Sequence, residues 1–253
     1  MNEPRDPMRA AQASTRQPAV KRFYKKAELR EVAGGGFELT LDGRPARTPG
    51  KNRLAAASRA LMAGVAEEWA RQGDTLDPAD MPVTRLLNSA IDGVARTMDE
   101  TRAELARYAG SDLLCYRAET PETLAERQRL AFDPVLAWAA EALGARFNLA
   151  AGVVHVAQPP EAIAAVRAAL DAVDDPAALA ALSVITNLTG SALLALAVQR
   201  GALGAETAWA AAHVDEDFQN ERWGVDDEAQ VRRAARWREM EAAARVLAAT
   251  RGP

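Results

Sequence analysis

Cysteine and histidine are almost missing from this chain of 253 residues. Cys115 is the single cysteine, so no disulfide can form within the chain, and a reducing compartment is expected. His155 and His213 are the only histidines, which leaves too few ligands for most zinc sites. We therefore expect the protein to work without a metal ion or another cofactor.

Long hydrophobic runs and an excess of basic charge are also missing. Gln199 and Arg200 interrupt the most apolar region before it reaches the ~18 residues of a membrane-spanning helix, so membrane insertion is not expected. The chain has 31 Lys and Arg against 35 Asp and Glu, and a formal charge of -4 argues against a phosphate-binding surface. A nucleic-acid partner is therefore not expected.

The first twenty residues lack the apolar segment of a secretory signal peptide. Glu3 and Asp6 argue against a mitochondrial transit peptide as well, since such peptides contain few acidic residues. We expect residues 1–20 to be a disordered lead-in.

Hydrophobic residues make up 49% of the chain, which is typical of a globular protein of one or two domains. From Lys21 to Thr48 the pattern predicts β-strands, because apolar residues alternate with polar ones from Phe37 to Leu41. Asp42-Gly43 follows directly and suits a two-residue hairpin turn. A β-hairpin is therefore expected in the amino-terminal part.

After Asn52 the chain becomes rich in alanine, which favours helices. A helix that starts at Pro82 places one set of apolar residues on a narrow arc and a set of polar residues on the opposite one. The apolar set is Leu87, Ile91, Val94 and Met98, and the polar set is Arg85, Asn88 and Asp92. The polar set is either a second contact surface or a solvated or hydrogen-bonded face, and the latter interpretation is preferred.

Further helices are expected in seven segments, most of which begin at or just after Pro or Asp. Their bounds are about Pro121–Leu130, Pro134–Leu143, Pro160–Val173, Pro176–Leu188, Ala192–Gln199, Ala205–Arg222 and Asp227–Ala248. The short run Gly152–Val156 could form a strand. The predicted fold class is α+β, with a small amino-terminal α+β domain at residues 21–115 and a larger all-helical domain at residues 116–253.

Residues that could carry covalent chemistry are few. Cys115 lies in an apolar run without a histidine nearby, which is typical of a packed cysteine, and His155 has apolar neighbours. His213 and Asp217 have the i, i+4 spacing that can chelate a metal, but Asp215 points away from both on a helix. No GxSxG motif supports a hydrolase. We therefore expect no catalytic residues and no small-molecule substrate.

The segment Ala208–Ala229 is the most informative one. On a single helix, Trp209, Glu216, Asn220 and Trp223 fall on one side, which places a carboxylate between two indoles. Such a face is suited to docking, because Trp is enriched at interfaces and a partly buried acid gives specificity. Alternatively, both indoles pack on the next helix and Glu216 pairs with Arg232 or Arg233. The spacing does not decide between the two.

Several blocks of the sequence together resemble one family, the ATP-synthase assembly chaperones that act on the α subunit of the catalytic head. The similarity spans Lys21 to Leu247. The blocks are RFYK from Arg22, LDGRPARTP from Leu41, EEWARQGDTLDPADMPVTRLLNSAIDGV from Glu67, SDLLCYRAE from Ser111, FDPVLAWA from Phe132, LTGSALLALAV from Leu188, and AWAAAHVDEDFQNERWG from Ala208.

The resemblance implies a non-enzymatic chaperone that holds the newly made α subunit of F-type ATP synthase until the β subunit replaces it. It also implies that Glu216 corresponds to a functionally essential glutamate of the family, and that Gln219 and Trp223 belong to the same block. Together with Trp209 and Asn220, these residues form the predicted partner-binding site. The family's mitochondrial members carry transit peptides, so the sequence is expected to be a bacterial, cytoplasmic version.

Two other functions stay open from the residues alone. One is a metal-dependent hydrolase centred on His213, Asp215 and Asp217. The other is a general interaction scaffold with a different client, whose docking face would have the same composition.

Overall fold

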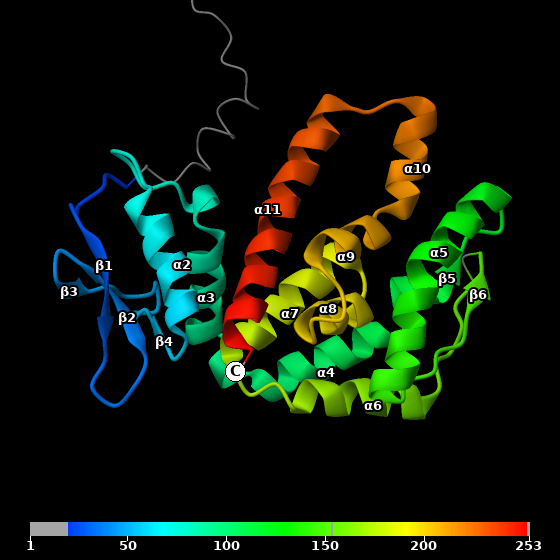
Figure 1. Ribbon diagram of the computed structural model, residues 1–253, viewed down its shortest axis with the longest axis horizontal. Coiled ribbons are helices and arrows are strands. Elements are labelled where there is room, and N and C mark those ends of the chain that lie inside the picture. The colour runs from blue at the N-terminus through cyan, green and yellow to red at the C-terminus, as the bar shows by residue number, and fades with distance from the viewer. Residues whose placement is uncertain (1–19, 153, 252–253) are drawn as a thin grey trace, which may run out of the picture.

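The computed structural model describes residues 20–152 and 154–251. The predicted lead-in, residues 1–20, lies outside this part of the chain except for Val20. A small four-stranded sheet with two helices is followed by a larger group of helices (Figure 1). The predicted α+β class is confirmed. Among the described residues, no helix is both long enough and apolar enough to span a bilayer.

The sheet is antiparallel and contains the predicted hairpin. β1 (Ala27–Glu31) pairs with β2 (Phe37–Leu41), which also pairs with β3 (Arg44–Pro45) and β4 (Ala55–Ala56). Asp42 and Gly43 form the turn between β2 and β3 with φ angles of 49° and 79°, the positive values that a tight hairpin turn of this kind needs. Leu39 and Leu41 of β2 lie in the core, and the polar residues Glu38 and Thr40 that alternate with them are buried as well.

Helix α2 (Arg59–Ala70) packs on β1 and β2, and α3 (Pro82–Asp92) follows the short 3-10 helix η1 (Pro78–Asp80). The Ser58 hydroxyl caps α2 by accepting the backbone N–H of Leu61. The buried carboxylate of Glu68 on α2 accepts the backbone N–H groups of Val83 and Thr84, both at 2.8 Å. A carboxylate from α2 therefore satisfies the free N–H groups at the start of α3.

The helix that starts at Pro82 is shorter than predicted. It ends at Asp92, and Val94 and Met98 belong to η2 (Val94–Arg96) and α4 (Met98–Ala109). Gly93 follows α3 directly, and glycine is a common residue at helix ends. The predicted apolar arc therefore does not lie on one helix.

On the polar side of α3, Asp92 forms hydrogen bonds within the protein, whereas the buried Oδ1 of Asn88 has no partner among the described residues. The Asp92 carboxylate accepts Thr48 Oγ1–H at 2.6 Å, the Gly50 N–H at 2.7 Å and Asn52 Nδ2–H at 2.8 Å. These bonds hold the pKa of Asp92 below its ordinary value. A Cβ at Gly50 would lie 2.6 Å from the Asp92 carboxylate, so the close approach requires glycine. This network supports the hydrogen-bonded interpretation of the polar side.

In residues 113–152 and 154–251 the structure consists of helices and one short two-stranded sheet, joined by loops. Its elements are η3 (Leu113–Cys115), β5 (Tyr116–Arg117), α5 (Glu122–Trp138), the π-helical turn η4 (Ala139–Leu143), β6 (Ala150–Ala151), α6 (Pro160–Asp171), α7 (Pro176–Thr189), α8 (Ala192–Gln199), α9 (Ala205–Ala212), α10 (Val214–Trp223) and α11 (Asp227–Thr250). The predicted helices that begin at Pro160, Pro176, Ala192 and Asp227 are confirmed.

One prediction in the middle of the chain is wrong. The segments expected as separate helices at 121–130 and 134–143 form one helix, α5, which contains Pro134 and continues into η4. The strand considered possible at 152–156 is not formed by residues 154–156, and Val153 lies outside the described residues. Ala150–Ala151 form a strand instead, parallel to β5.

Helix α11 joins the two parts of the molecule. Its carboxy-terminal half packs on α7 and also on α2 and α3, and the Ser58 hydroxyl donates to the Ala249 carbonyl oxygen at 2.6 Å. Helix α4 packs on α6, α7 and α8. One hydrophobic cluster extends from Tyr24 to Leu247. The boundary at residue 115 stays a prediction, and the packing across it is continuous.

Candidate functional site

The segment predicted as one helix from Ala205 to Arg222 is broken at His213 into α9 and α10. The buried His213 ring stacks on the Trp209 indole with centroids 3.8 Å apart, and its Nδ1–H donates to the Trp209 carbonyl oxygen at 2.8 Å. Burial lowers the pKa of His213, so the ring is neutral at pH 7. Because of this break, Trp209 and Trp223 lie on different helices, and the predicted arrangement of two indoles on one helix face is wrong.

A groove of about 680 Å³ lies between α10 and the facing part of α11, the two helices that extend away from α7, α8 and α9 (Figure 1). We call it the α10–α11 groove. It is lined by Trp209, Glu216, Asp217, Asn220, Glu221, Val225, Ala229, Gln230, Arg233, Ala234 and Trp237. Most of its polar lining comes from α10, and α11 contributes Ala229, Gln230, Arg233, Ala234 and Trp237.

Two indoles form part of the groove wall. Trp209 is 8% exposed, and its ring meets that of Trp237 edge to face with centroids 5.5 Å apart. Arg236 lies over the Trp209 ring at 5.8 Å. The groove therefore offers a preformed aromatic surface.

Glu216 faces Arg233 across the groove. Its Oε1 lies 3.7 Å from Arg233 Nη1, and its side chain stays 39% exposed. Asp217 forms a hydrogen-bonded ion pair with the same arginine, which raises the pKa of Arg233 above its ordinary value. The pairing of Glu216 with Arg233 that we considered is present, but it is long and leaves the carboxylate accessible from the groove.

The structure brings together three of the five predicted site residues. Trp209, Glu216 and Asn220 line the α10–α11 groove, whereas Gln219 and Trp223 do not. Gln219 is exposed, and Trp223 is 76% exposed at the end of α10. Val225 in the connection between α10 and α11 is 48% exposed, and Val231 in the first part of α11 is 71% exposed.

Trp237 is a groove residue that the sequence analysis did not single out. Arg233 and Trp237 stand at i, i+4 on α11 and therefore share a face. That spacing is visible in the sequence. The sequence does not show that this face lies opposite α10, since its position depends on how α11 packs on α7.

One buried side chain holds α10 in place. Phe218 is 4% exposed and is covered by the guanidinium groups of Arg222 and Arg127, 4.1 Å and 5.2 Å from its ring centre. Arg127 of α5 also forms an ion pair with Glu221 at 2.7 Å. Gln128 Nε2–H donates to Asp215 at 2.7 Å. Helix α10 is therefore attached to α5 on one side and open to the groove on the other.

The residues considered for metal chemistry are separate in the structure. His213 is hydrogen-bonded to Trp209, Asp215 to Gln128, and Asp217 to Arg233. No cluster of three or more potential metal ligands occurs within residues 20–152 and 154–251. Burial raises the pKa of Cys115 to about 12, so its thiol stays protonated at neutral pH.

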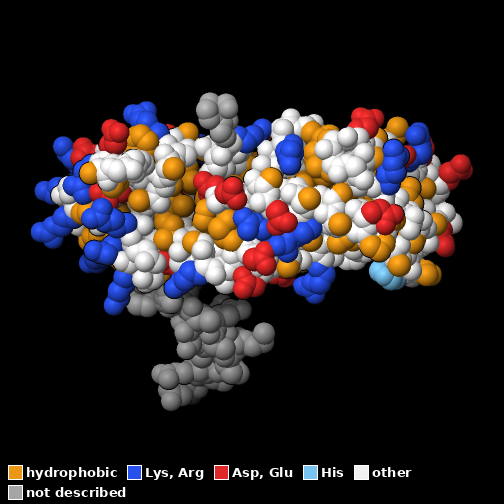
Figure 2. Space-filling model, turned by 90° about the horizontal axis from the view of Figure 1, so that it is seen from below, with side chains coloured by type: hydrophobic (Ala, Val, Ile, Leu, Met, Phe, Trp, Pro, Cys, Tyr) orange, Lys and Arg blue, Asp and Glu red, His pale blue; other side chains and the backbone are white. Residues whose placement is uncertain are grey.

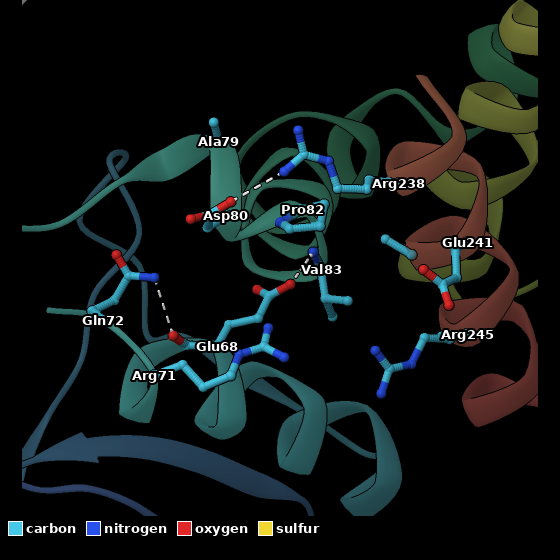
Figure 3. Close-up of a pocket in the computed structure, with 11 residues that line it drawn as sticks. Glu68, Arg71, Gln72, Ala79, Asp80, Pro82, Val83, Arg238, Glu241 and Arg245 are labelled. Atoms are coloured by element: carbon cyan, nitrogen blue, oxygen red, sulfur yellow. Dashed lines mark hydrogen bonds and ion pairs between the residues drawn. The ribbon is translucent and has the colours of Figure 1, made fainter. Parts of the chain in front are cut away.

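A second hollow of about 420 Å³ lies where α2, η1 and α3 meet α11 (Figure 3). Arg238 reaches across it to Asp80 at 3.2 Å, and Arg71 and Arg245 also border it. Glu68 lies at its edge with its carboxylate bound to α3. None of the predicted site residues lines this hollow.

Comparison with known proteins agrees with this architecture. Residues 21–140 match the family described as ATP12 chaperone protein. The crystal structure of the Atu1473 protein from Agrobacterium tumefaciens is 49% identical over 98% of this chain and 92% of that one, with a TM-score of 0.89. The crystal structure of Atp12 from Paracoccus denitrificans is 41% identical over 92% of this chain and 99% of that one, with a TM-score of 0.85. A mutant of the same Paracoccus protein matches equally well, with 41% identity and a TM-score of 0.85. The chain therefore belongs to the ATP12 family of ATP-synthase assembly chaperones.

Proposed function

We propose that this protein binds the unassembled α subunit of F-type ATP synthase through the α10–α11 groove and covers its subunit interface until the β subunit replaces it. The observation that carries this proposal is the groove itself. It places the indoles of Trp209 and Trp237 beside the accessible carboxylate of Glu216. Aromatic anchors next to a partly buried charge are the usual composition of a protein-binding site.

The proposed activity needs binding and no covalent chemistry. An orphan subunit exposes the apolar surface that its neighbour will later cover, and such surfaces aggregate. A groove with a limited apolar wall and a polar rim can shield that surface and still be displaced by the true partner. The open side of α10 and the exposed residues around Trp223 suit such a transient contact.

Glu216 is the proposed specificity contact. Among the described residues its one ion pair is the long one to Arg233, and surface pairs of this kind contribute about 0–1 kcal/mol to stability. Its replacement should therefore leave the fold intact. A charge that pairs across an interface is worth more, and its loss costs about 2–5 kcal/mol of binding.

The test is co-purification of the protein with a tagged α subunit and, in parallel, with a tagged β subunit. We expect capture of α and no capture of β. The E216K variant should lose α while its circular dichroism spectrum and melting temperature stay as in the wild type. Glu141→Lys makes the same charge change at an exposed position on η4, far along the chain from the groove, and should retain α.

Each other outcome contradicts a part of the proposal. Capture of β, or of neither subunit, contradicts the α subunit as client and favours a scaffold with another partner. Unchanged capture by E216K excludes Glu216 from the contact. A large drop in melting temperature for E216K alone assigns the residue a structural role.

A further inference from the structure

A second surface with the composition of a binding site lies on the sheet, away from the α10–α11 groove. It is a hollow of about 680 Å³, which we call the sheet hollow. It is lined by Phe23, Tyr24, Leu41, Asp42, Arg44, Pro45, Ala46, Arg47 and Trp69. Residues from the chain before β1, from the β2–β3 hairpin and from α2 thus meet around one depression.

The aromatic residues of the sheet hollow form a fixed platform. Tyr24 is buried, and its hydroxyl donates to the Trp69 carbonyl oxygen at 2.6 Å. The rings of Phe23 and Trp69 both contact the Tyr24 ring, with centroid distances of 5.4 Å and 5.5 Å. Phe23 is 65% exposed. A large aromatic side chain held on a packed neighbour and open to solvent is suited to contact with an apolar group.

Positive charge borders the same hollow. Arg44 and Arg47 are both exposed, and within the described part of the chain neither forms an ion pair. The one carboxylate in the lining, Asp42, accepts the backbone N–H groups of Lys25 and Lys26, which keeps its pKa below the ordinary value. Asp42 is thus bound to the backbone. Arg47 Nη1–H donates to the Lys51 carbonyl oxygen at 2.7 Å, so Arg44 and the remaining N–H groups of Arg47 are the donors offered to a ligand.

The surrounding surface has the same sign of charge. Residues 21–59 contain ten Lys and Arg against four Asp and Glu, whereas the whole chain has 31 against 35. Lys and Arg side chains accordingly gather at the sheet end of the molecule, on the left in Figure 2. A local excess of one sign raises the rate and specificity of binding to a partner of opposite charge.

We propose that the sheet hollow is a second docking site, independent of the α10–α11 groove, that takes an acidic segment of a partner polypeptide with an aromatic side chain in it. The aromatic side chain stacks on Phe23 while neighbouring carboxylates pair with Arg44 and Arg47. The guanidinium groups favour carboxylates because they offer paired donors in one plane.

The distribution of charge also disfavours two other occupants of the sheet hollow, namely residues 1–19 and a nucleic acid. Residues 1–19 contain three arginines and two acidic residues, so their charge does not complement a basic hollow. A nucleic acid would meet the same arginines, but the rest of the chain has 21 Lys and Arg against 31 Asp and Glu and repels a long phosphate backbone. An acidic peptide segment fits the local charge without this penalty.

The test uses the full-length protein and a fluorescent synthetic peptide of alternating aspartate and phenylalanine residues, followed by fluorescence anisotropy. The matched peptide has asparagine in place of each aspartate. We expect the acidic peptide to bind at least tenfold more tightly than the amide peptide, and its affinity to fall as salt rises. Arg44→Glu and Phe23→Ala should each weaken binding at least fivefold. Both residues are exposed, so both variants should keep the wild-type circular dichroism spectrum.

Arg146→Glu, at an exposed position in the helical part, is the control for net charge and should bind as the wild type does. The E216K variant should also bind normally, which separates this site from the proposed α-subunit contact. The proposal is overturned if the acidic and amide peptides bind equally, or if R44E and R146E weaken binding alike. It is also overturned if a single-stranded oligonucleotide displaces the peptide at lower concentration than an unlabelled acidic peptide does. Salt-sensitive self-association in sedimentation experiments that R44E abolishes would assign the hollow to a second copy of this chain.

Discussion

The base of the helical part and the arm that extends from it are stabilised in different ways. In α8 every residue from Ala192 to Val198 is buried, whereas Phe218 is the one buried residue of α10. Helix α11 contains both situations, since all of its buried residues lie at or after Met240. We call α10 and residues 227–239 of α11 the arm, and α7, α8 and residues 240–250 of α11 the base. The base is held by apolar burial and the arm by ion pairs and one aromatic anchor, so a client can approach the arm without disturbing the core.

The largest effect should follow from removing apolar volume in the base. Leu193 on α8 is fully buried, and Leu193→Ala should lower the free energy of unfolding by about 3–4 kcal/mol, because buried Leu-to-Ala changes leave a cavity that the packed surroundings fill incompletely. Urea denaturation followed by circular dichroism measures this loss.

The matched change on the arm is Val231→Ala at a position that is 71% exposed. It should change the free energy of unfolding by less than about 0.5 kcal/mol. Equal losses in the two variants would contradict the division into a buried base and an exposed arm.

The same division explains which parts of the molecule could be predicted from the sequence. The turn at Asp42-Gly43 was predictable because its positive φ angles depend on the two residues themselves. The break at His213 was not, since it contains neither proline nor glycine and depends on the packing of Trp209 between His213 and Trp237. At Pro134 a helix start was predicted where the structure has none. Proline is common at helix starts, but here it lies inside α5.

In the candidate site, too, local features could be predicted from the sequence and long-range packing could not. Glu216 and Asn220 were found from their spacing on one helix, which is a local property. Trp237 lies in the groove because α11 returns beside α10 after packing on α7, which is a long-range property. The predicted site therefore includes two of the four α10 residues that line the groove and none of those from α11.

A buried carboxylate makes the base sensitive to pH. Asp112 is fully buried and accepts the backbone N–H groups of Leu114 in η3 and Leu193 at the start of α8, each at 3.1 Å. Burial raises the pKa of Asp112 from 3.8 to about 6. Between pH 3.8 and about 6, the folded protein therefore keeps a proton on Asp112 that the unfolded chain has already released. Asp112 contributes fully to stability below pH 4. As the pH rises through 6, the free energy of unfolding falls by about 2–3 kcal/mol because this contribution is lost.

The D112N variant isolates this contribution, because an amide does not titrate. As the pH rises from 4 to 7, the free energy of unfolding of the wild type should fall relative to that of D112N. Other carboxylates, such as Asp92, have lowered pKa values and act in the opposite direction in both proteins, so the difference between the two curves is the quantity to compare. Parallel curves would show that Asp112 does not titrate in this range.

A smaller effect should follow from removing the ion pairs of the arm. Arg233→Met leaves Glu216 and Asp217 without their shared partner, and the two carboxylates then repel each other. The side chains are partly exposed, so the expected cost is about 1 kcal/mol. Amide hydrogen exchange in α10 should become about fivefold faster, while exchange in α8 stays unchanged. High salt should produce the same acceleration in the wild type, and faster exchange in α8 as well would contradict a separately opening arm.

The smallest effect on stability should come with a clear effect on binding. Trp223 is 76% exposed, so Trp223→Ala should leave the free energy of unfolding within about 0.5 kcal/mol of the wild type. An exposed tryptophan is nevertheless a common energetic centre of an interface, and α-subunit affinity should fall at least tenfold if the client contacts the end of the arm as well as the groove. Titration of the tagged α subunit measures this directly. Wild-type affinity in W223A, together with lost affinity in E216K, would confine the contact to the groove, where Trp209 and Trp237 would then supply the aromatic surface.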